Sequence, residues 1–277
     1  MCAIKFYNGI EIPPIIMSTN WMDYSTMKEV VSAGLKTGFR AFDTARDYGN
    51  EHIVGKVLKE CLAEQGLKRE DIFITTKIGN GQQRLGNIAE QINVSLKNLQ
   101  TDYVDCWLMH WPYPNYYIDT YHKMEKVYQS GKVRAIGMAN YHVRHFKKLW
   151  EAGFDIAPHC VQFEHHPMRT ADDIIAFCRA HDIVIQAYSP LCRMIDPKNS
   201  PILKAIADRT GKSVGQVILR WHYQHQSVPC FKSINIKRLE ENFDIWDFEL
   251  TGGDMAAINS MNCDYKYHIE SASCPGF

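Results

Sequence analysis

The stretch "FRAFDTARDYGNEHIVGKVLKECLAEQG", residues 39–66, decides the fold of this chain. Its first five residues are mostly apolar and are typical of a short buried strand that ends at Asp43. Residues 50–66 then follow a helical period, with Gly66 as the expected stop. The apolar face of this helix carries Ile53, Val54, Val57, Leu58 and Leu62. A strand followed by an amphipathic helix is the repeating unit of parallel α/β proteins.

The same unit recurs along the 277 residues. Further strand candidates are the runs 14–19, 72–77, 103–110, 133–139, 159–164, 183–189 and 227–232. Helical patterns lie between them, and no Ser- or Pro-rich linker divides the chain. Eight strands, each followed by a helix, predict an α/β protein, a (β/α)8 TIM barrel forming one domain over residues 1–277. A doubly wound sheet is the alternative, which the lack of GxGxxG after the first strand disfavours.

The N-terminal residues predict one more element. "AIKF" (3–6) and "GIEI" (9–12) flank the turn "YNG", a pattern typical of a β-hairpin. We expect this hairpin to cap the bottom of the barrel.

Composition limits the possible partners. Lys plus Arg and Asp plus Glu number 31 each, so zero formal charge gives no electrostatic footprint for nucleic acid or an anionic membrane. No run approaches the ~18 apolar residues of a transmembrane helix, and no secretory signal is visible. The nine cysteines are odd in number and lack CxxC spacing. They predict reduced thiols in a cytoplasmic protein.

Three polar residues end consecutive strand candidates. Asp43, Lys77 and His110 are separated by 34 and 33 residues, about one strand-helix unit each. Because chemistry in such barrels gathers at the C-terminal ends of the strands, these side chains should meet at one rim. Tyr48 lies five residues after Asp43 and should reach the same place. The neighbouring Arg46, Asp47 and Glu51 are expected to be ordinary loop and helix-start polarity.

This group suits proton donation to a carbonyl. A tyrosine has an ordinary pKa of about 10 and needs a cation to stabilise its phenolate. Lys77 can supply that cation and lower the pKa of Tyr48, while Asp43 keeps Lys77 protonated and in place. His110 can donate a hydrogen bond to the substrate carbonyl. No side chain here supplies a hydride, so a bound cofactor must.

The motifs of the chain resemble those of the aldo-keto reductases along nearly its whole length. "GFRAFDTARDYGNEHIVGKVL" is similar to the family signature GxRxxDTAxxYxNExxVGxAL, and "FITTKI", "LMHWP", "GKVRAIGMANY", "VQFEHHP", "AYSPL" and "KSINIKRLEEN" follow in the family order. The resemblance implies a (β/α)8 barrel with an N-terminal hairpin cap and an extra C-terminal helix. It also implies extended binding of NADP(H) and a catalytic tetrad of Asp43, Tyr48, Lys77 and His110.

The resemblance further implies the cofactor contacts. Asn140 and Gln162 match residues that hold the nicotinamide carboxamide, and Tyr188 matches the aromatic under the ring. Ser189 and Leu191 fall near the pyrophosphate. The 2′-phosphate and adenine contacts match Lys232, Ser233, Arg238, Glu241 and Asn242. A Lys and an Arg around a hydroxyl suit a phosphate monoester, which favours NADP over NAD. A monomer is expected by resemblance.

Some positions depart from the family pattern or concern the substrate. Ala139 stands where the family usually has Ser, and residues 17–22 replace a glycine-containing turn, so Trp21 is expected as a pocket wall on resemblance alone. Trp111 and Tyr113 follow His110 and could form an aromatic wall. The connecting loops and the tail are short, which predicts a fairly open pocket for an aldehyde or ketone of modest size. Arg193 would favour an anionic substrate, although a solvated arginine is the simpler expectation.

Two other enzymatic or binding roles stay open on the sequence. A Schiff-base aldolase could use Lys77 as nucleophile, which requires a neutral amine that Asp43 opposes. A non-enzymatic NADP(H) sensor could use the same fold. Metal binding is not expected, because the adjacent histidines of "EHHP" (164–167) point to opposite faces of a strand and His52 adds no recognisable spacing.

Overall fold

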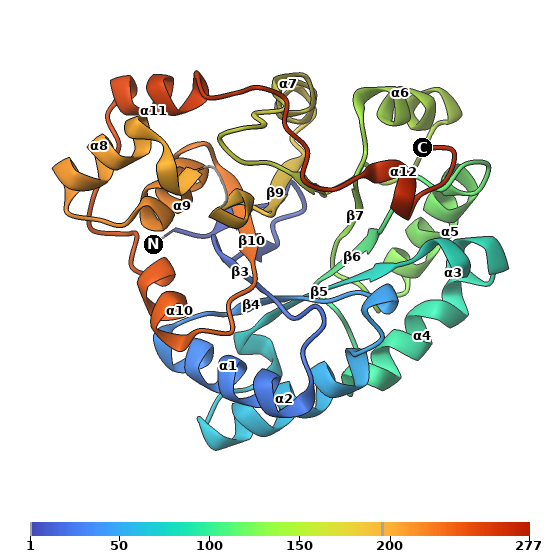
Figure 1. Ribbon diagram of the computed structural model, residues 1–277. Coiled ribbons are helices and arrows are strands. Elements are labelled where there is room, and N and C mark those ends of the chain that lie inside the picture. The colour runs from blue at the N-terminus through green and yellow to red at the C-terminus, as the bar shows by residue number, and fades with distance from the viewer. Residues whose placement is uncertain (1, 195–196) are drawn as a thin grey trace.

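The computed structural model describes residues 2–194 and 197–277, and they form a closed parallel barrel (Figure 1). The strands neighbour one another in the order β10-β3-β4-β5-β6-β7-β8-β9. Their bounds are β3 Ile16–Ser18, β4 Ala41–Asp43, β5 Phe73–Ile78, β6 Cys106–Met109, β7 Ile136–Ala139, β8 Cys160–Glu164, β9 Val184–Tyr188 and β10 Ser227–Phe231. All eight predicted strands are confirmed, most of them shorter than expected. The doubly wound alternative is wrong, because β10 pairs with β3 and leaves no sheet edge.

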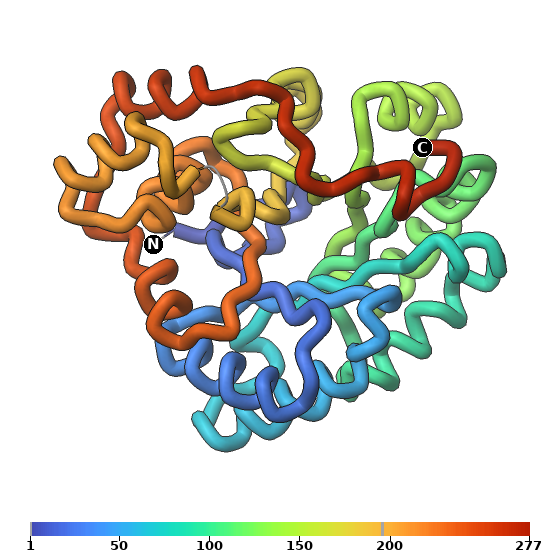
Figure 2. Tube along the Cα trace, in the orientation of Figure 1, coloured from blue at the N-terminus to red at the C-terminus, as the bar shows by residue number. Residues whose placement is uncertain are grey.

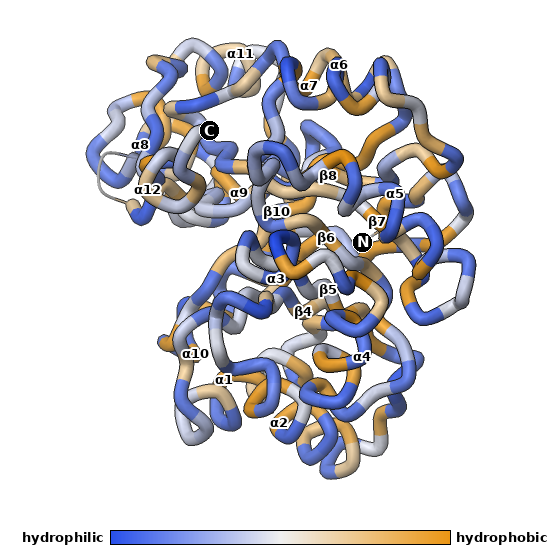
Figure 3. Tube along the Cα trace, turned by 90° about the vertical axis from the view of Figure 1, so that its right-hand side faces the viewer, coloured by the Kyte–Doolittle hydropathy of each residue, from blue (hydrophilic) through white to orange (hydrophobic). Residues whose placement is uncertain are grey.

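Helices surround the barrel and connect its strands (Figure 1). They are α1 Tyr24–Thr37, α2 Glu51–Glu64, α3 Asn80–Leu85, α4 Ile88–Leu99, α5 Tyr117–Gln129, α6 Val143–Ala152, α7 Asp172–Ala180, α8 Pro201–Thr210, α9 Val214–Gln224 and α10 Ile236–Phe243. Helix α2 ends two residues before Gly66, whose φ is 66°. Hydrophilic and hydrophobic residues alternate along α1 and α2 in Figure 3, as expected for helices with one face on the barrel. No helix in residues 2–194 and 197–277 is long and apolar enough to cross a membrane.

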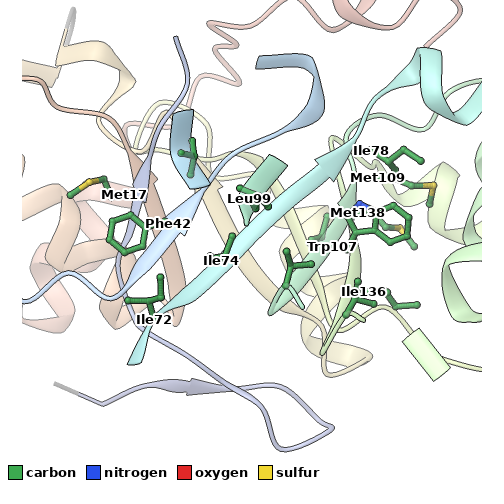
Figure 4. Close-up of a cluster of buried hydrophobic side chains, with 14 of the residues drawn as sticks. Met17, Phe42, Ile72, Ile74, Ile78, Leu99, Trp107, Met109, Ile136 and Met138 are labelled. Carbon is green, nitrogen blue, oxygen red and sulfur yellow. The ribbon is translucent and has the colours of Figure 1, made fainter. Parts of the chain in front are cut away.

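The strands sort their side chains between two cores. Outward residues such as Phe42, Ile74 and Trp107 pack under the helices, in the cluster that Figure 4 shows. Inward residues such as Phe73 and Leu108 form a second cluster inside the barrel. Successive side chains of a strand point to opposite faces. Because Phe42 points outward, its neighbours Ala41 and Asp43 point inward.

The predicted hairpin closes the lower end of the barrel. Strands β1 (Ile4–Lys5) and β2 (Glu11–Ile12) pair antiparallel across a turn at Gly9, which has φ 88°. A side chain would disfavour that backbone conformation, so glycine suits the turn. Phe6 and Ile12 are fully buried and join the inner cluster. The inner barrel is thus apolar at the bottom, which leaves its upper end for polar residues.

The C-terminal residues cross the upper end of the barrel. After α11 (Gly252–Asn259) the chain runs as the red segment of Figures 1 and 2 to α12 (Glu270–Ser273), where Glu270 contacts His142 just before α6. Two backbone N–H groups of this segment, on Tyr267 and His268, donate to the Glu164 carboxylate at the end of β8. The expected extra C-terminal helix is therefore present, and the segment around it lies over part of the strand ends.

Candidate active site

A buried ion pair forms the base of the site. Asp43 ends β4 and Lys77 lies near the end of the adjacent β5, both pointing inward by the alternation of the strands. The Lys77 Nζ lies 2.6 Å from each Asp43 carboxylate oxygen, and these side chains are only 1% and 2% exposed. Nζ also donates to the carbonyl oxygen of Thr44, and Gln162 donates to Asp43 Oδ2 at 3.0 Å. The carboxylate is thus held on both sides.

Asp43 determines the charge of Lys77. Burial lowers the pKa of Lys77, but Asp43, together with the smaller effects of Tyr48 and Cys230, raises it by more, and the net pKa lies above the ordinary lysine value. The amine is therefore an ammonium ion at neutral pH. This charge state opposes a Schiff-base role, which needs a neutral amine.

Tyr48 reaches the pair from a short helical turn. The 3-10 helix η1 (Arg46–Tyr48) ends at Gly49, whose φ of 69° reverses the chain before α2. This turn brings Tyr48 Oη to 3.3 Å from Lys77 Nζ. Burial raises the pKa of Tyr48 to about 12, although Lys77 by itself lowers it. The predicted influence of Lys77 has the right sign, but burial outweighs it, and the phenol keeps its proton at neutral pH.

His110 follows β6 and faces Tyr48 across the rim. The two rings meet edge to face at 5.7 Å, and the histidine side chain is 14% exposed. Burial lowers the pKa of His110 below its ordinary value, the hydrogen bond that His110 donates to Asp47 raises it by less, and Lys77 lowers it further. The ring is therefore neutral at pH 7. All four residues of the predicted tetrad meet at one rim.

Two residues expected to be loop polarity have specific contacts instead. The carboxylate of Asp47 lies 3.0 Å from His110 Nδ1. Glu51 is 2% exposed and accepts a hydrogen bond from Thr76 on β5, which fixes the start of α2 against the barrel. The expectation of ordinary loop polarity was wrong for these two residues. Their partners lie 63 and 25 residues further along the chain, where no local sequence pattern could indicate them.

The amide side chains beside the tetrad fit a nicotinamide carboxamide. Asn140, at φ 64° after β7, donates to the His110 carbonyl oxygen and accepts from Tyr188 Oη at 2.8 Å. Gln162 directs its NH2 group to Asp43 and Gln186. Within residues 2–194 and 197–277, no donor contacts the side-chain oxygen of Gln162, and Asn140 Oδ1 accepts only from Tyr188, so both oxygens can accept from a carboxamide NH2. Tyr188 is fixed by its hydrogen bond next to both amides.

Lys232, expected at the phosphate site, has a second cation beside it. Lys232 and Arg193 are close enough that Arg193 lowers the pKa of Lys232, together with the larger effect of burial. Within residues 2–194 and 197–277, no carboxylate oxygen lies within 4.0 Å of the side-chain nitrogens of Lys232, Arg193 or Arg238. Such unneutralised cations fit a bound phosphate. Arg193 stacks on Tyr267 at 3.8 Å, so it is held by the C-terminal segment.

The remaining residues of the expected cofactor set are dispersed around this cluster. Ser189 has φ 49° at the turn after β9, and Leu191 packs partly into the core. Ser233 caps the turn before α10 by donating to the Asn235 carbonyl oxygen. Glu241 is exposed, whereas Asn242 is 8% exposed and lies against Gly215 of α9. Their roles toward a cofactor stay predictions.

The expected substrate side is aromatic and includes His268, which the sequence did not suggest. Trp111 is 4% exposed, and its ring packs against His268 at 5.7 Å and Phe277 at 5.7 Å. His268 also contacts Tyr188. Tyr113 stacks on Tyr116. The C-terminal segment therefore packs its aromatic rings against Trp111 beside His110, and the expectation of a fairly open pocket stays a prediction.

Trp21 lies on a different side of the rim. Its side chain is 74% exposed, with φ 52°, and Lys232 Nζ lies 5.9 Å above its ring. The structure thus places it beside the cation cluster, and its role as a pocket wall stays a prediction. Among the described residues, no group of three His, Cys, Asp or Glu side chains could hold a metal ion.

The fold agrees with comparisons to known proteins. The model of the Aldo/keto reductase family matches residues 16–262. The chain is 39% identical to a glyoxal reductase of Bacillus subtilis, covering 95% of this chain and 94% of that protein. It is 34% identical to a methylglyoxal reductase of Escherichia coli O157:H7, covering 94% and 93%. This chain belongs to the aldo/keto reductase family.

A solved structure extends the comparison to the cofactor. An aldo-keto reductase of the silkworm, Bombyx mori, in complex with NADPH matches with a TM-score of 0.90 and 29% identity. The match covers 96% of this chain and 89% of that one. Family membership and this likeness support use of a nicotinamide cofactor.

Proposed function

We propose that this protein reduces small aldehydes and ketones to alcohols with NADPH, and that Tyr48 is the proton donor. One observation carries the proposal: the Lys77 ammonium is held by both oxygens of Asp43 and lies 3.3 Å from the Tyr48 hydroxyl. The cofactor, when bound, supplies the hydride. The phenol of Tyr48 holds a proton for the substrate oxygen, and the phenolate left behind is stabilised by Lys77.

The order of pKa values suits reduction. The pKa of Tyr48 is raised to about 12 by burial, so the donor is fully protonated at neutral pH. An alkoxide, which forms as hydride reaches the carbonyl carbon, is a stronger base than a phenolate. The proton therefore moves from Tyr48 to the substrate, and Asp43 prevents Lys77 from losing the charge that makes this transfer favourable.

The preference for NADPH rests on the cation cluster. Asn140, Gln162 and Tyr188 would hold and orient the nicotinamide, while Lys232, Ser233 and Arg238 would bind the 2′-phosphate. Arg193 is close enough to Lys232 to add to the same field.

The relatives support a small substrate. Glyoxal and methylglyoxal are the compounds after which two of them are named, and Trp111, His268 and Phe277 pack together beside His110. We extend the proposal to short aldehydes and α-dicarbonyl compounds. A cytoplasmic location fits the nine free cysteines, which suit a reducing compartment.

The test is Tyr48→Phe, assayed by NADPH oxidation with glyoxal and methylglyoxal. Turnover should be lost while NADPH binding, followed by protein fluorescence, is unchanged. Tyr223→Phe is the matched control, since that ring packs on Trp246 in the outer layer. Full activity of Tyr48→Phe would exclude Tyr48 as the acid. Borohydride trapping of a carbonyl on Lys77 would instead favour the aldolase, and tight NADPH binding without turnover of any carbonyl would favour the sensor.

A further inference from the structure

The contact between Asp47 and His110 determines which ring nitrogen of the histidine carries its proton. Asp47 Oδ2 lies 3.0 Å from His110 Nδ1. A carboxylate has no proton to donate at neutral pH and can only accept. The hydrogen of this bond must therefore sit on Nδ1. In a neutral imidazole the other nitrogen, Nε2, then has a lone pair and no hydrogen.

The surroundings of Nε2 make this tautomer relevant to chemistry. Within residues 2–194 and 197–277, no protein group is hydrogen-bonded to His110 Nε2, and this nitrogen is not one of the fully buried polar atoms that lack a partner. The ring meets Tyr48 edge to face at 5.7 Å and stacks loosely on Trp111. The free nitrogen is thus available to a molecule bound beside Tyr48.

The position of Asp47 is built into two elements. Asp47 lies in η1, one residue before Tyr48, so the turn that delivers the phenol also delivers the carboxylate. On the other side it abuts Gly79, at the end of β5. A Cβ on Gly79 would lie 1.9 Å from Asp47 Oδ1 and 2.4 Å from its carboxylate carbon. The absence of a side chain at Gly79 therefore makes the room that Asp47 occupies.

We propose that Asp47 is a positioning residue that fixes neutral His110 as the Nδ1–H tautomer, so that Nε2 accepts hydrogen bonds from a substrate and donates one only after the ring is protonated. The inference rests on the proposed function for its catalytic meaning. It replaces the simpler expectation that neutral His110 donates to the carbonyl. At neutral pH, Tyr48 is then the donor to the carbonyl oxygen, and His110 suits a substrate that also carries a hydroxyl, such as a hydroxyaldehyde or a hydrated dicarbonyl.

Three charged groups at the rim shift the pKa of His110. The ammonium of Lys77 on β5 opposes protonation of the ring, whereas the carboxylates of Asp43 on β4 and Asp47 favour it. Tyr48 is neutral at these pH values. Because burial outweighs the carboxylates, protonation occurs below the ordinary histidine range. In the wild type, kcat/KM for a simple aldehyde should therefore rise as the pH falls through that lower range.

The decisive experiment is 15N–1H NMR of the histidine rings at pH 8, on the protein alone and with NADP+ bound. The signals of His110 are identified by their loss in His110→Asn. The proton should sit on Nδ1 in the wild type. Asp47→Leu, which has no acceptor, and Gly79→Ala should both lose this preference, the second because its methyl group displaces the carboxylate without removing the charge. The φ of Gly79 is −84°, which alanine adopts freely.

Kinetics give the second readout. The acid-side rise of kcat/KM should disappear from the measured window in Asp47→Asn and Gly79→Ala, and persist in the control Asp102→Asn, an exposed carboxylate. A wild-type proton on Nε2, an Asp47→Leu variant with the wild-type tautomer, or an Asp47→Asn variant with the wild-type pH profile would overturn the inference. If no carbonyl is turned over at all, the proposed function fails, while the NMR result still tests the tautomer.

Discussion

The Glu164 carboxylate should act as the anchor of the C-terminal segment, and Glu164→Gln tests this directly. The side chain is 3% exposed and accepts from the backbone N–H groups of Tyr267 at 2.6 Å and His268 at 2.9 Å. It also contacts His166 Nε2 at 3.0 Å. A glutamine has the same shape, but its NH2 group would face one of the two N–H donors.

The expected loss follows from these contacts. A hydrogen bond to a charged group contributes about 1.5–3 kcal/mol. Losing one such bond and weakening the other should cost about 3 kcal/mol in the free energy of local opening. Since 1.4 kcal/mol is a factor of ten, the segment should open roughly 100-fold more often. Because His268 packs on Trp111, kcat/KM for small aldehydes should fall as well.

Hydrogen exchange measures the effect where it arises. The amides of Tyr267 and His268 should exchange roughly 100-fold faster in Glu164→Gln, while the amides of the barrel strands keep their protection. Glu29→Gln, on the exposed face of α1, is the matched control. Unchanged protection at Tyr267 and His268 in a folded Glu164→Gln protein would refute the reasoning.

The pH dependence of this anchor has a definite sign. Burial raises the pKa of Glu164, but the hydrogen bonds from His166, Tyr267 and His268 lower it by more, and the net pKa lies below the ordinary value. A depressed pKa stabilises the folded state above the pKa of the unfolded chain, and this stabilisation is lost as the pH falls through the folded value. Protection of the segment should persist at pH 5 to 7 and decline only in stronger acid.

Two further outcomes are expected. Lys77→Met should lower the free energy of unfolding, measured by urea denaturation, by about 3–5 kcal/mol because it leaves the Asp43 charge buried and unpaired. The double variant Asp43→Asn/Lys77→Met should recover part of that loss. Equal stability of the single and the double variant would contradict a cost of burying the unpaired charge. Lys232→Ala should weaken NADPH binding about ten- to 100-fold, the worth of a hydrogen bond to a charged group, and leave NADH binding unchanged in a fluorescence titration. Lys237→Ala on the following helix α10 is the control, and an equal effect on both cofactors would argue against a 2′-phosphate contact.

Much of the barrel could be predicted from local pattern. The apolar run that ends at Asp43 and the helical face after it are set by residues close in sequence, since backbone period and side-chain burial act over a few residues. The spacing of Asp43, Lys77 and His110 then places them together, because parallel strands of a barrel end at the same rim. The family motifs supplied the assignment of Tyr48.

The pKa of Tyr48 illustrates what pattern could not give. The sequence indicates that Lys77 is near and lowers this pKa, which is true of its own contribution. The net direction depends on how much of the phenol is removed from water, a property of packing around η1 and the strand ends. Burial outweighs the cation, and the pKa is raised to about 12.

The sequence by itself determined the eight strand-helix units and the closing hairpin and predicted the tetrad, because each follows from short-range periodicity or from motif order. Only the tertiary structure decided the contacts that join distant segments. Asp47 meets His110 across 63 residues, and Glu164 meets Tyr267 across 103. No local sequence pattern identifies such pairs, because the sequence around a polar loop residue is the same whether its side chain contacts water or another side chain. Closure of the barrel and the path of the C-terminal segment bring them together, and with them the charge and tautomer states on which the chemistry depends.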